Sequence, residues 1–539
     1  MLDMILKGGT VVDGSGLPAR RADVGILDGK IAIVQDLGEA EAAKTIDVSG
    51  LHVCPGFIDM HSHSDLSLMA HRKGESSLSQ GITTEVIGNC GWSLAPVKDE
   101  TRKSVLEGLL SGLIDAESFD SLDWSWHSFG EWMAALEKGG IGVNVAPQVG
   151  QSLVRAHVVG TEKREAAPGE PEAMKALVRQ AMEDGAWGMS TGRSYRPGGH
   201  APTEEIIELA KVVGQYGGIY ATHMKNEGDD IFEAVNEVIR IAEEAGVRAE
   251  ISHHKAVGRK NFGKVNRTLE MIEKARRRGL AITVDVYPYE FSQASSIVRM
   301  LPEGAWQDLK GKAFAGEYPT NEEIHAILAD KSLMEKIKAH PAIAEAAPRL
   351  KGFFIVKAPS MPHAEGRVVE DLVAETGRSP VDIVFDLVAA DGLEAWAASC
   401  ISMEDVHTVI KAGFAMGGTD GFNLDRVIDN AIHPRHYGTF PRIVGRFVTK
   451  DRLFSLEEAV KKVTRNPALV MGIPDRGMVE AGYWADLVVF DHERLMDTAT
   501  GTEPYKRADG IEYVLVNGKI ALEKGEVKPA FAGKVLRRR

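Results

Sequence analysis

Strand-like and helix-like segments alternate through the middle of this chain, and that alternation restricts the fold more than any other feature. Pro or Thr-Glu-Glu marks several helix starts and glycine several helix ends, so helices are predicted at 171–184, 203–216, 230–245 and 266–278. Runs typical of strands lie at 187–190, 219–223, 248–253 and 281–287. Such alternation predicts a parallel sheet, and its length favours a (β/α)8 TIM-like barrel. A doubly wound sheet is the alternative, although no Gly-x-Gly-x-x-Gly pattern follows a first strand.

Short β-rich runs separated by turns occur at both ends of the chain. They lie at 4–12, 22–26 and 30–34 near the N-terminus, and at 485–490 and 511–519 near the C-terminus. Neither set can bury both faces of a sheet alone. We therefore expect a small β-sandwich domain built from residues 1–54 and 471–539, with the barrel between them at 55–470. Residues from about 302 to 400 interrupt the alternation and are predicted to form an insertion over the barrel mouth.

Composition narrows the class of protein and its partners. The 539 residues are 44% hydrophobic and 26% charged, as in ordinary globular proteins. A net charge of −14 argues against nucleic acid and anionic membranes as partners. No signal-peptide pattern opens the sequence and no apolar run reaches roughly 18 residues, so we expect a cytoplasmic protein. The three cysteines, Cys54, Cys90 and Cys400, are too few for a disulfide framework.

The stretch Gly-Phe-Ile-Asp-Met-His-Ser-His-Ser-Asp at 56–65 carries the first candidates for chemistry. Its apolar residues predict a buried strand, and His61 and His63 follow two positions apart. Side chains two apart on a strand point to the same side. Two imidazoles at a strand end form half of a metal site. The alternative is a hydrogen-bonded core histidine beside a surface one.

Four further candidates each follow an apolar run. Cys90 lies in Gly-Asn-Cys-Gly after one predicted strand, His223 and His253 end two others, and Asp420 ends the last one, at 414–420. Chemistry in a barrel of this kind lies at the carboxyl ends of the strands, so these side chains should converge with the histidine pair. Imidazole and thiolate are preferred ligands of zinc. Six ligands exceed one tetrahedral site, which leaves open two metal positions sharing Cys90 or one metal beside a carboxylate base.

Each candidate also has a purely structural explanation. Cys90 alone could be a packed core residue. Asp420 could cap a helix, because Asp is common before a turn of this kind. Lys255 could be a solvated charge, and His254, which faces away from His253 on a strand, is interpreted as structural.

Eight sequence blocks join these candidates to other polar residues: 56–63, Gly-Asn-Cys-Gly at 88–91, Ser-Thr-Gly-Arg-Ser-Tyr at 190–195, Thr-His-Met-Lys-Asn-Glu-Gly-Asp at 222–229, Ile-Ser-His-His-Lys at 251–255, Tyr-Pro-Tyr at 287–289, Gly-Thr-Asp-Gly at 418–421 and His-Pro-Arg-His-Tyr-Gly-Thr-Phe-Pro-Arg at 433–442. Together they resemble the N-acyl-D-amino-acid deacylases (D-aminoacylases) of the amidohydrolase superfamily. The resemblance covers nearly the whole chain. It implies a zinc-dependent barrel that hydrolyses N-acyl-D-amino acids to a carboxylate and a free D-amino acid.

The resemblance also implies a role for each site residue. Cys90, His223 and His253 would hold a tightly bound zinc. His61 and His63 would belong to a second, weaker position that shares the thiolate. Asp420 would be the general base. Contacts to the scissile carbonyl or to the α-carboxylate of the substrate are expected from Tyr195, Lys255 and Tyr287. Apart from the resemblance, charge complementarity suggests that Lys255, joined by Arg299, would hold the free carboxylate.

Two other functions compete with this one. A hydantoinase-like or dihydroorotase-like enzyme shares the His-x-His start but bridges its metals with a carboxylated Lys, and no Lys closes the strand at 187–190. An inactive scaffold would lack ligands, and all six candidates are present.

The D preference rests on the resemblance. Lys225 and the run 290–296 depart from the family pattern and leave the side-chain preference open. The expected partner is a small molecule; a homo-oligomer is compatible with the sequence, which does not specify oligomeric state.

Overall fold

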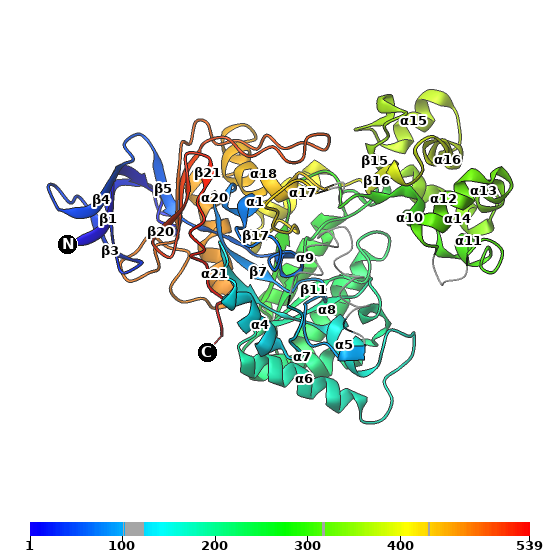
Figure 1. The fold of residues 1–539 in the computed structure, drawn as a ribbon, viewed down its shortest axis with the longest axis horizontal. Helices are drawn as coiled ribbons and strands as arrows, with labels where there is room; N and C mark the ends of the chain where they lie inside the picture. Colours follow the sequence, from blue (N-terminus) through cyan, green and yellow to red (C-terminus); the bar gives the residue numbers. More distant parts are fainter. Residues whose placement is uncertain (101, 103–122, 315–318, 429–431, 539) are drawn as a thin grey trace.

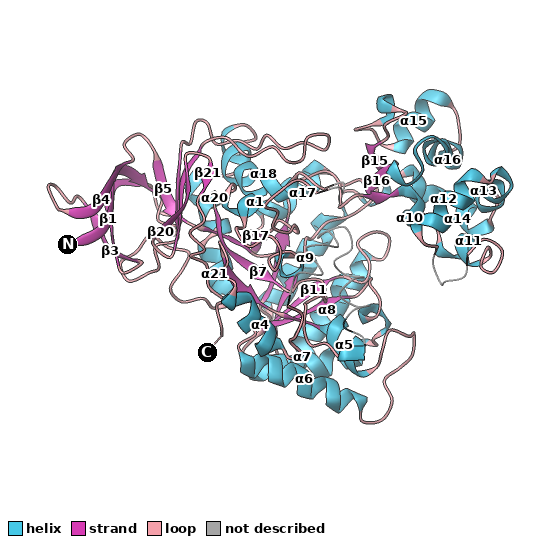
Figure 2. Cartoon of the chain, viewed as in Figure 1, coloured by secondary structure: helices cyan, strands magenta, loops and turns pink. Residues whose placement is uncertain are grey.

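The computed structural model describes residues 1–100, 102, 123–314, 319–428 and 432–538. A β-domain lies beside the N-terminus, a barrel occupies the centre, and a mainly helical lobe lies at the opposite side of the molecule (Figure 1). Figure 2 shows strands in the β-domain and at the centre of the barrel, with helices around the barrel strands. Among the described residues, no helix is long and apolar enough to cross a membrane.

The β-domain contains a sheet of nine strands drawn from both ends of the chain. The strand order is β21-β20-β19-β18-β5-β1-β2-β3, with β4 paired to β1. Strand β5 pairs in parallel with β1 and antiparallel with β18, so it joins the two ends as predicted. The strands are β1 (Leu2–Val11), β2 (Arg20–Leu27), β3 (Lys30–Gln35), β4 (Ala42–Asp47), β5 (His52–Pro55), β18 (Leu487–Phe490), β19 (Ile511–Val516), β20 (Lys519–Glu523) and β21 (Glu526–Val527).

The barrel strands form two parallel sheets, ordered β6-β7-β8 and β9-β10-β11-β12-β13-β17. Only Gln148 separates β8 from β9, and the Met60 amide donates to the Gly417 carbonyl at 3.4 Å beside the first and last strands. The two sheets thus meet near both ends of the strand order without one continuous hydrogen-bond ladder, and with β8 and β9 taken as one interrupted strand they give the arrangement of the predicted (β/α)8 barrel. The strands are β6 (Phe57–Asp59), β7 (Ile82–Ile87), β8 (Asn144–Pro147), β9 (Val149–Gly150), β10 (Gly188–Gly192), β11 (Ile219–His223), β12 (Arg248–Ile251), β13 (Ile282–Val286) and β17 (Ala415–Gly417).

Amphipathic helices cover the barrel. In α8, residues 231, 234, 235, 238, 241 and 242 are buried, which is the spacing of one helix face. The four helices predicted between the central strands match α6 to α9 within two residues at each end. The helices are α1 (Glu75–Leu78), α4 (Phe129–Lys138), α5 (Gln151–Val158), α6 (Glu170–Asp184), α7 (Thr203–Gln215), α8 (Ile231–Ala245), α9 (Lys264–Arg277), α17 (Met403–Lys411), α18 (Arg435–Pro441), α19 (Phe447–Thr449), α20 (Leu456–Val463) and α21 (Arg465–Met471); short 3₁₀ turns are η1 (Ser64–Leu66), η2 (Gly198–His200) and η3 (Arg259–Asn261), and η6 (Arg442–Arg446) is a π-helix.

The insertion is a lobe with its own hydrophobic core, which includes Trp306, Phe353 and Leu387. Ion pairs between Arg259 and Asp371 at 2.8 Å and between Arg196 and Glu303 at 3.0 Å tie the lobe to loops at the barrel mouth. Its elements are β14 (Ser295–Ser296), α10 (Ile297–Met300), α11 (Glu303–Gln307), α12 (Asn321–Ala329), α13 (Lys331–Lys338), α14 (Pro341–Lys351), β15 (Phe353–Lys357), η4 (Pro362–Ala364), α15 (Val369–Thr376), α16 (Pro380–Asp391), η5 (Gly392–Glu394) and β16 (Trp396–Ser399).

A proline divides one helical stretch of the lobe in two. The range 331–347 forms two helices, α13 and α14, because Pro341 disfavours helical geometry at His340 and starts a new helix instead. The domain boundaries placed at 54, 470 and about 302–400 stay predictions.

Candidate metal centre

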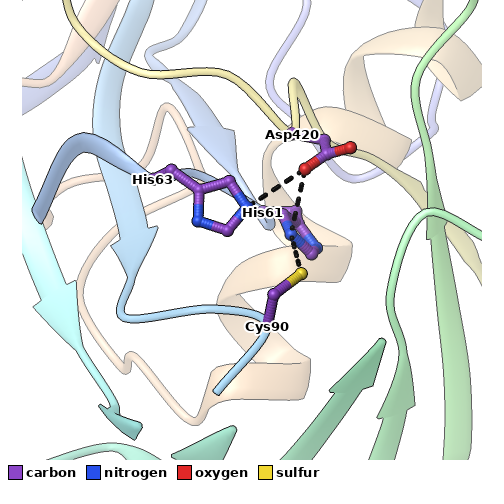
Figure 3. Close-up of side chains that lie close together, drawn as sticks. All are labelled: His61, His63, Cys90 and Asp420. Carbon is purple, nitrogen blue, oxygen red and sulfur yellow. Dashed lines mark hydrogen bonds and ion pairs between the residues drawn. The ribbon is translucent and has the colours of Figure 1, made fainter. Parts of the chain in front are cut away.

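Side chains from three barrel strands meet at the carboxyl end of the barrel (Figure 3). His61 and His63 follow β6, Cys90 follows β7 and Asp420 follows β17. Asp420 Oδ1 lies 3.1 Å from His63 Nε2 and 3.5 Å from His61 Nε2. Cys90 Sγ lies 3.4 Å from His61 Nε2. These four residues form one compact set of possible metal ligands.

A second set shares the same thiol. His223 ends β11 and His253 follows β12. Cys90 Sγ lies 3.9 Å from His223 Nδ1 and 3.5 Å from His253 Nε2, and these two ring nitrogens are 2.9 Å apart. The structure therefore brings together all six residues that the sequence singled out, with Cys90 between two groups of ligands.

Three of these six residues adopt the left-handed backbone region that non-glycine residues rarely occupy. The φ angles are 52° at Cys90, 37° at His253 and 49° at Asp420. Such conformations cost about 1–3 kcal/mol each and cluster at functional sites, where the surrounding structure enforces them. The strain therefore coincides with the residues predicted to bind metal.

Electrostatics keep the thiol and the carboxyl of this centre ionised. Burial raises the pKa of the Cys90 thiol, but His61 and His253 outweigh burial and hold it well below its ordinary value. Burial likewise opposes ionisation of Asp420, but Arg435 and His253 hold its pKa well below the usual range. The thiolate is the form that binds metals, and a carboxylate can accept a proton.

The imidazoles respond to the same negative charge. Burial lowers the pKa of His63, but its hydrogen bond to Asp420 raises it to about 9. Burial and Lys255 lower the pKa of His253, but the Glu227 and Asp420 carboxylates raise it to about 9. Surroundings that favour an imidazolium also favour a bound cation. With imidazole, thiolate and carboxylate donors converging, the site fits a transition metal.

Carboxylates lie behind most of the histidines. Glu227 lies 3.0 Å from His253 Nδ1 and 4.0 Å from His223 Nε2, on the sides of the rings that face away from Cys90. Asp285 lies 3.2 Å from His61 Nδ1 in the same way. Carboxylates in such positions orient histidine ligands and raise their basicity. No role behind the histidines was predicted for either carboxylate from the sequence, although Glu227 lies four residues after His223 in the block 222–229.

A cavity of about 400 Å³ opens over the centre. Tyr195, Lys255 and Tyr287, from which the sequence predicts substrate contacts, line it. Tyr195 Oη lies 3.2 Å from His223 Nδ1, on the Cys90 side of that ring. Lys255 Nζ donates to Glu227 Oε1 at 2.7 Å, so this cation is anchored beside the histidines.

Arg435 is a cavity residue that the sequence analysis missed. Its Nη1 donates to Asp420 Oδ2 at 2.5 Å, and its guanidinium stacks 4.8 Å from the centre of the Tyr287 ring. Its Nε is buried and has no hydrogen-bond partner among the described residues. The block His-Pro-Arg-His after Asp420 was the available signal, because it places a cation between two histidines, His433 and His436.

Arg299 is the predicted site residue that the structure does not bring to the cavity. It lies in α10 of the lobe, where its guanidinium donates to Asn321 Oδ1. It is not among the residues that line the cavity over the metal centre. The lobe carries α10 away from the barrel strands (Figure 1), and the expected contact of Arg299 with the α-carboxylate stays a prediction.

Comparisons with known proteins agree with this geometry. The amidohydrolase family profile matches residues 44–522. The D-aminoacylase of Alcaligenes xylosoxydans xylosoxydans is 37% identical over 99% of this chain and 98% of its own. A D-aminoacylase structure described by its binuclear metal center is 36% identical, covers both chains fully and has a TM-score of 0.78. An N-acyl-D-glutamate deacylase from Bordetella bronchiseptica, solved with zinc and a phosphonate inhibitor, is 31% identical over 99% of both chains, with a TM-score of 0.78.

The six converging side chains, the barrel and the β-domain made from both chain ends thus belong to a chain that aligns end to end with these proteins. The chain belongs to the D-aminoacylase group of the amidohydrolase family.

Proposed function

We propose that this protein hydrolyses the amide bond of N-acyl-D-amino acids with the help of zinc. The products are a carboxylic acid and a free D-amino acid. The observation that carries the proposal is the thiolate–histidine centre beside an ionised Asp420, under a cavity lined by buried cations. Identity of 37% to a D-aminoacylase over nearly the full length supports the same activity.

Cys90, His223 and His253 hold the tighter zinc in this proposal, and His61 and His63 hold a weaker one that shares the thiolate. Zinc suits this mixture of imidazole and thiolate, and the related Bordetella deacylase was solved with zinc. When bound, the metal polarises the amide carbonyl and lowers the pKa of water.

The chain's own residues position the substrate. The α-carboxylate of the substrate pairs with Arg435, which has a free buried donor, and with Lys255 and Tyr287 beside it. The Tyr195 hydroxyl lies on the metal side of His223, where it can donate to the amide oxygen as negative charge develops there. The amino-acid end of the substrate is thereby held on the Asp420 side of the centre.

Asp420 moves the proton. It accepts a proton from the attacking water as the new C–O bond forms, and it then donates that proton to the nitrogen as the C–N bond breaks. The leaving amine is thus neutral when it departs. Arg435 holds the other carboxylate oxygen at 2.5 Å and fixes the orientation of the group that carries the proton.

The test is a screen of paired N-acetyl-D- and N-acetyl-L-amino acids, read by release of free amine, with hydantoin and dihydrouracil as cyclic-amide controls. We expect release from D substrates and loss of that release after a chelator, with recovery on adding zinc. Turnover of the cyclic amides without turnover of the D substrates would contradict the proposal.

A further inference from the structure

Cys90 occupies a turn whose backbone is unfavourable for a cysteine. The Trp92 amide donates to the Asn89 carbonyl at 3.0 Å, which closes a four-residue turn with Cys90 and Gly91 at its centre. Both central residues have positive φ, 52° and 81°, as in a type I′ turn. Such positions favour Gly, Asn or Asp, so the turn itself does not explain how a cysteine is held there.

The hydroxyl of Ser190 bridges this turn. Ser190 lies on β10, is fully buried, and reaches both peptide groups that flank the segment Asn89–Cys90. Its Oγ accepts a hydrogen bond from the Gly91 amide at 2.9 Å and donates one to the Gly88 carbonyl at 2.5 Å. One side chain from a neighbouring strand therefore fixes the entry to the turn and its exit at once.

The other contacts of the turn each hold one side of it. Asp65 accepts from the Gly88 amide at 3.0 Å, and the Asn89 side chain donates to two carbonyls that precede it in the chain. The Ser152 amide donates to the Gly91 carbonyl at 3.0 Å. Among the described residues, the side chain of Ser190 alone contacts backbone groups on both sides of Cys90.

We propose that Ser190 is a positioning residue for the Cys90 thiolate, and through it for both metal positions. Cys90 Sγ lies 3.4 Å from His61 Nε2 and 3.5 Å from His253 Nε2, so a small rotation of the turn alters both ligand sets. The Ser190 hydroxyl, which belongs to neither ligand set and does not line the cavity, thus sets the geometry of the shared ligand. The inference rests on the proposed role of Cys90 as a metal ligand.

The chain provides a matched control. Ser152 Oγ is a second buried hydroxyl beside the same turn, close to Gly91, but it has no hydrogen-bond partner among the described residues. Ser190→Ala and Ser152→Ala therefore each delete one buried hydroxyl at the same place in the fold. Only the first deletion removes a contact that fixes the turn.

The test compares the full-length wild type, Ser190→Ala, Ser190→Thr, Ser152→Ala and Cys90→Ala. Zinc affinity is measured by competition with a fluorescent chelator, and the thiolate-to-metal charge-transfer band is recorded after loading with cobalt. We expect a 10- to 100-fold loss of zinc affinity in Ser190→Ala, typical of removing a group that orients a ligand, together with a weakened or shifted band. Ser190→Thr, which keeps the hydroxyl, recovers much of both, and Ser152→Ala resembles wild type.

Wild-type zinc affinity and an unchanged cobalt band in Ser190→Ala would overturn the inference. A lowered unfolding temperature with unchanged metal binding would do the same, because it would give Ser190 a structural role only. If Ser190→Ala does not fold, the isosteric pair Ser190→Thr and Ser190→Val is compared in its place, and equal zinc affinity in the pair rejects the inference. Cys90→Ala separates the two claims, since a cobalt band that survives there would instead reject the metal assignment of Cys90.

Discussion

The two halves of the metal centre differ in what lies behind their ligands. In the half formed by His223 and His253, the outer nitrogens of both rings face the same carboxylate, Glu227. In the half formed by His61 and His63, Asp285 lies behind His61, but His63 Nδ1 is buried without a hydrogen-bond partner among the described residues. Asp420, which belongs to that half, divides its oxygens between His63 and Arg435.

This difference assigns tight zinc binding to one half of the centre and proton transfer to the other. Ligands held from behind by carboxylates lose little entropy on binding a metal, and their basicity is higher. The Glu227 side is therefore expected to bind zinc more tightly. A carboxylate that contacts a cation and an imidazole without being locked in a metal site is suited to accept and release a proton. Substitutions on the two sides of the centre test this division.

Cys90→Ala should have the largest effect, because it removes the ligand common to both halves. Loss of a residue that only orients a metal ligand lowers metal affinity by up to about a hundredfold, so loss of the ligand itself should lower zinc affinity by more than that. We expect most activity to be lost while the fold persists. Metal analysis and circular dichroism check this. Cys400→Ala, which changes a buried cysteine away from the centre, is the control. Retention of both zinc and turnover in Cys90→Ala would show that Cys90 is a metal ligand in neither half.

Asp420→Asn should separate proton transfer from metal binding. Asn keeps the size of the side chain but cannot take up a proton, so kcat should fall by at least about a hundredfold while tight zinc is retained. Steady-state kinetics and zinc content measure the two effects. Asp405→Asn, a buried carboxylate that accepts from the Gly263 amide, is the control. If Asp420 were only a cap, Asn would replace it with little loss, so wild-type kcat would reject the base assignment.

Glu227→Gln should weaken the tight half alone. The substitution removes the charge behind His223 and His253, and we expect a 10- to 100-fold loss of affinity for the first zinc. Chelator competition measures this, with the exposed Glu233→Gln on α8 as the control. Unchanged affinity would show that the carboxylate does not distinguish the two halves.

His63→Ala should have the smallest effect on the tight metal. We expect loss of affinity for a second zinc. Affinity for the first zinc should change by no more than about tenfold, the smallest effect typical of residues that orient metal ligands. Isothermal titration of the metal-free protein resolves the two steps. Equal weakening of both steps would place His63 in the principal site.

Much of the barrel could be predicted because its signals are local. Helix stops such as Gly217 and Gly246, and β-rich runs before His223 and His253, indicate element type without knowledge of the packing. Once parallel strands are assumed, residues at their carboxyl ends must meet at one mouth. The six ligands follow from that single geometric rule.

The rest of the site depends on contacts that no local pattern encodes. Arg435 contacts Asp420 because the loop after β17 leads back to helix α18 at the site. Glu227 contacts two histidines because the loop after β11 places it beside their outer nitrogens. The position of Arg299 outside the cavity lining has the same cause, since the path of the lobe places its side chain beside Asn321. Charged residues on long connections can be assigned only when the chain path is known.

The most direct test of the account is a zinc titration of the metal-free protein while hydrolysis of an N-acetyl-D-amino acid is followed. The half formed by Cys90, His223 and His253, with Glu227 behind both histidines, should bind the first zinc. That zinc should suffice for catalysis with Asp420 free. We therefore predict that activity reaches its maximum at one equivalent of zinc and that the second equivalent adds none. Activity that begins only after the first equivalent is bound, or that never responds to zinc, would contradict the account.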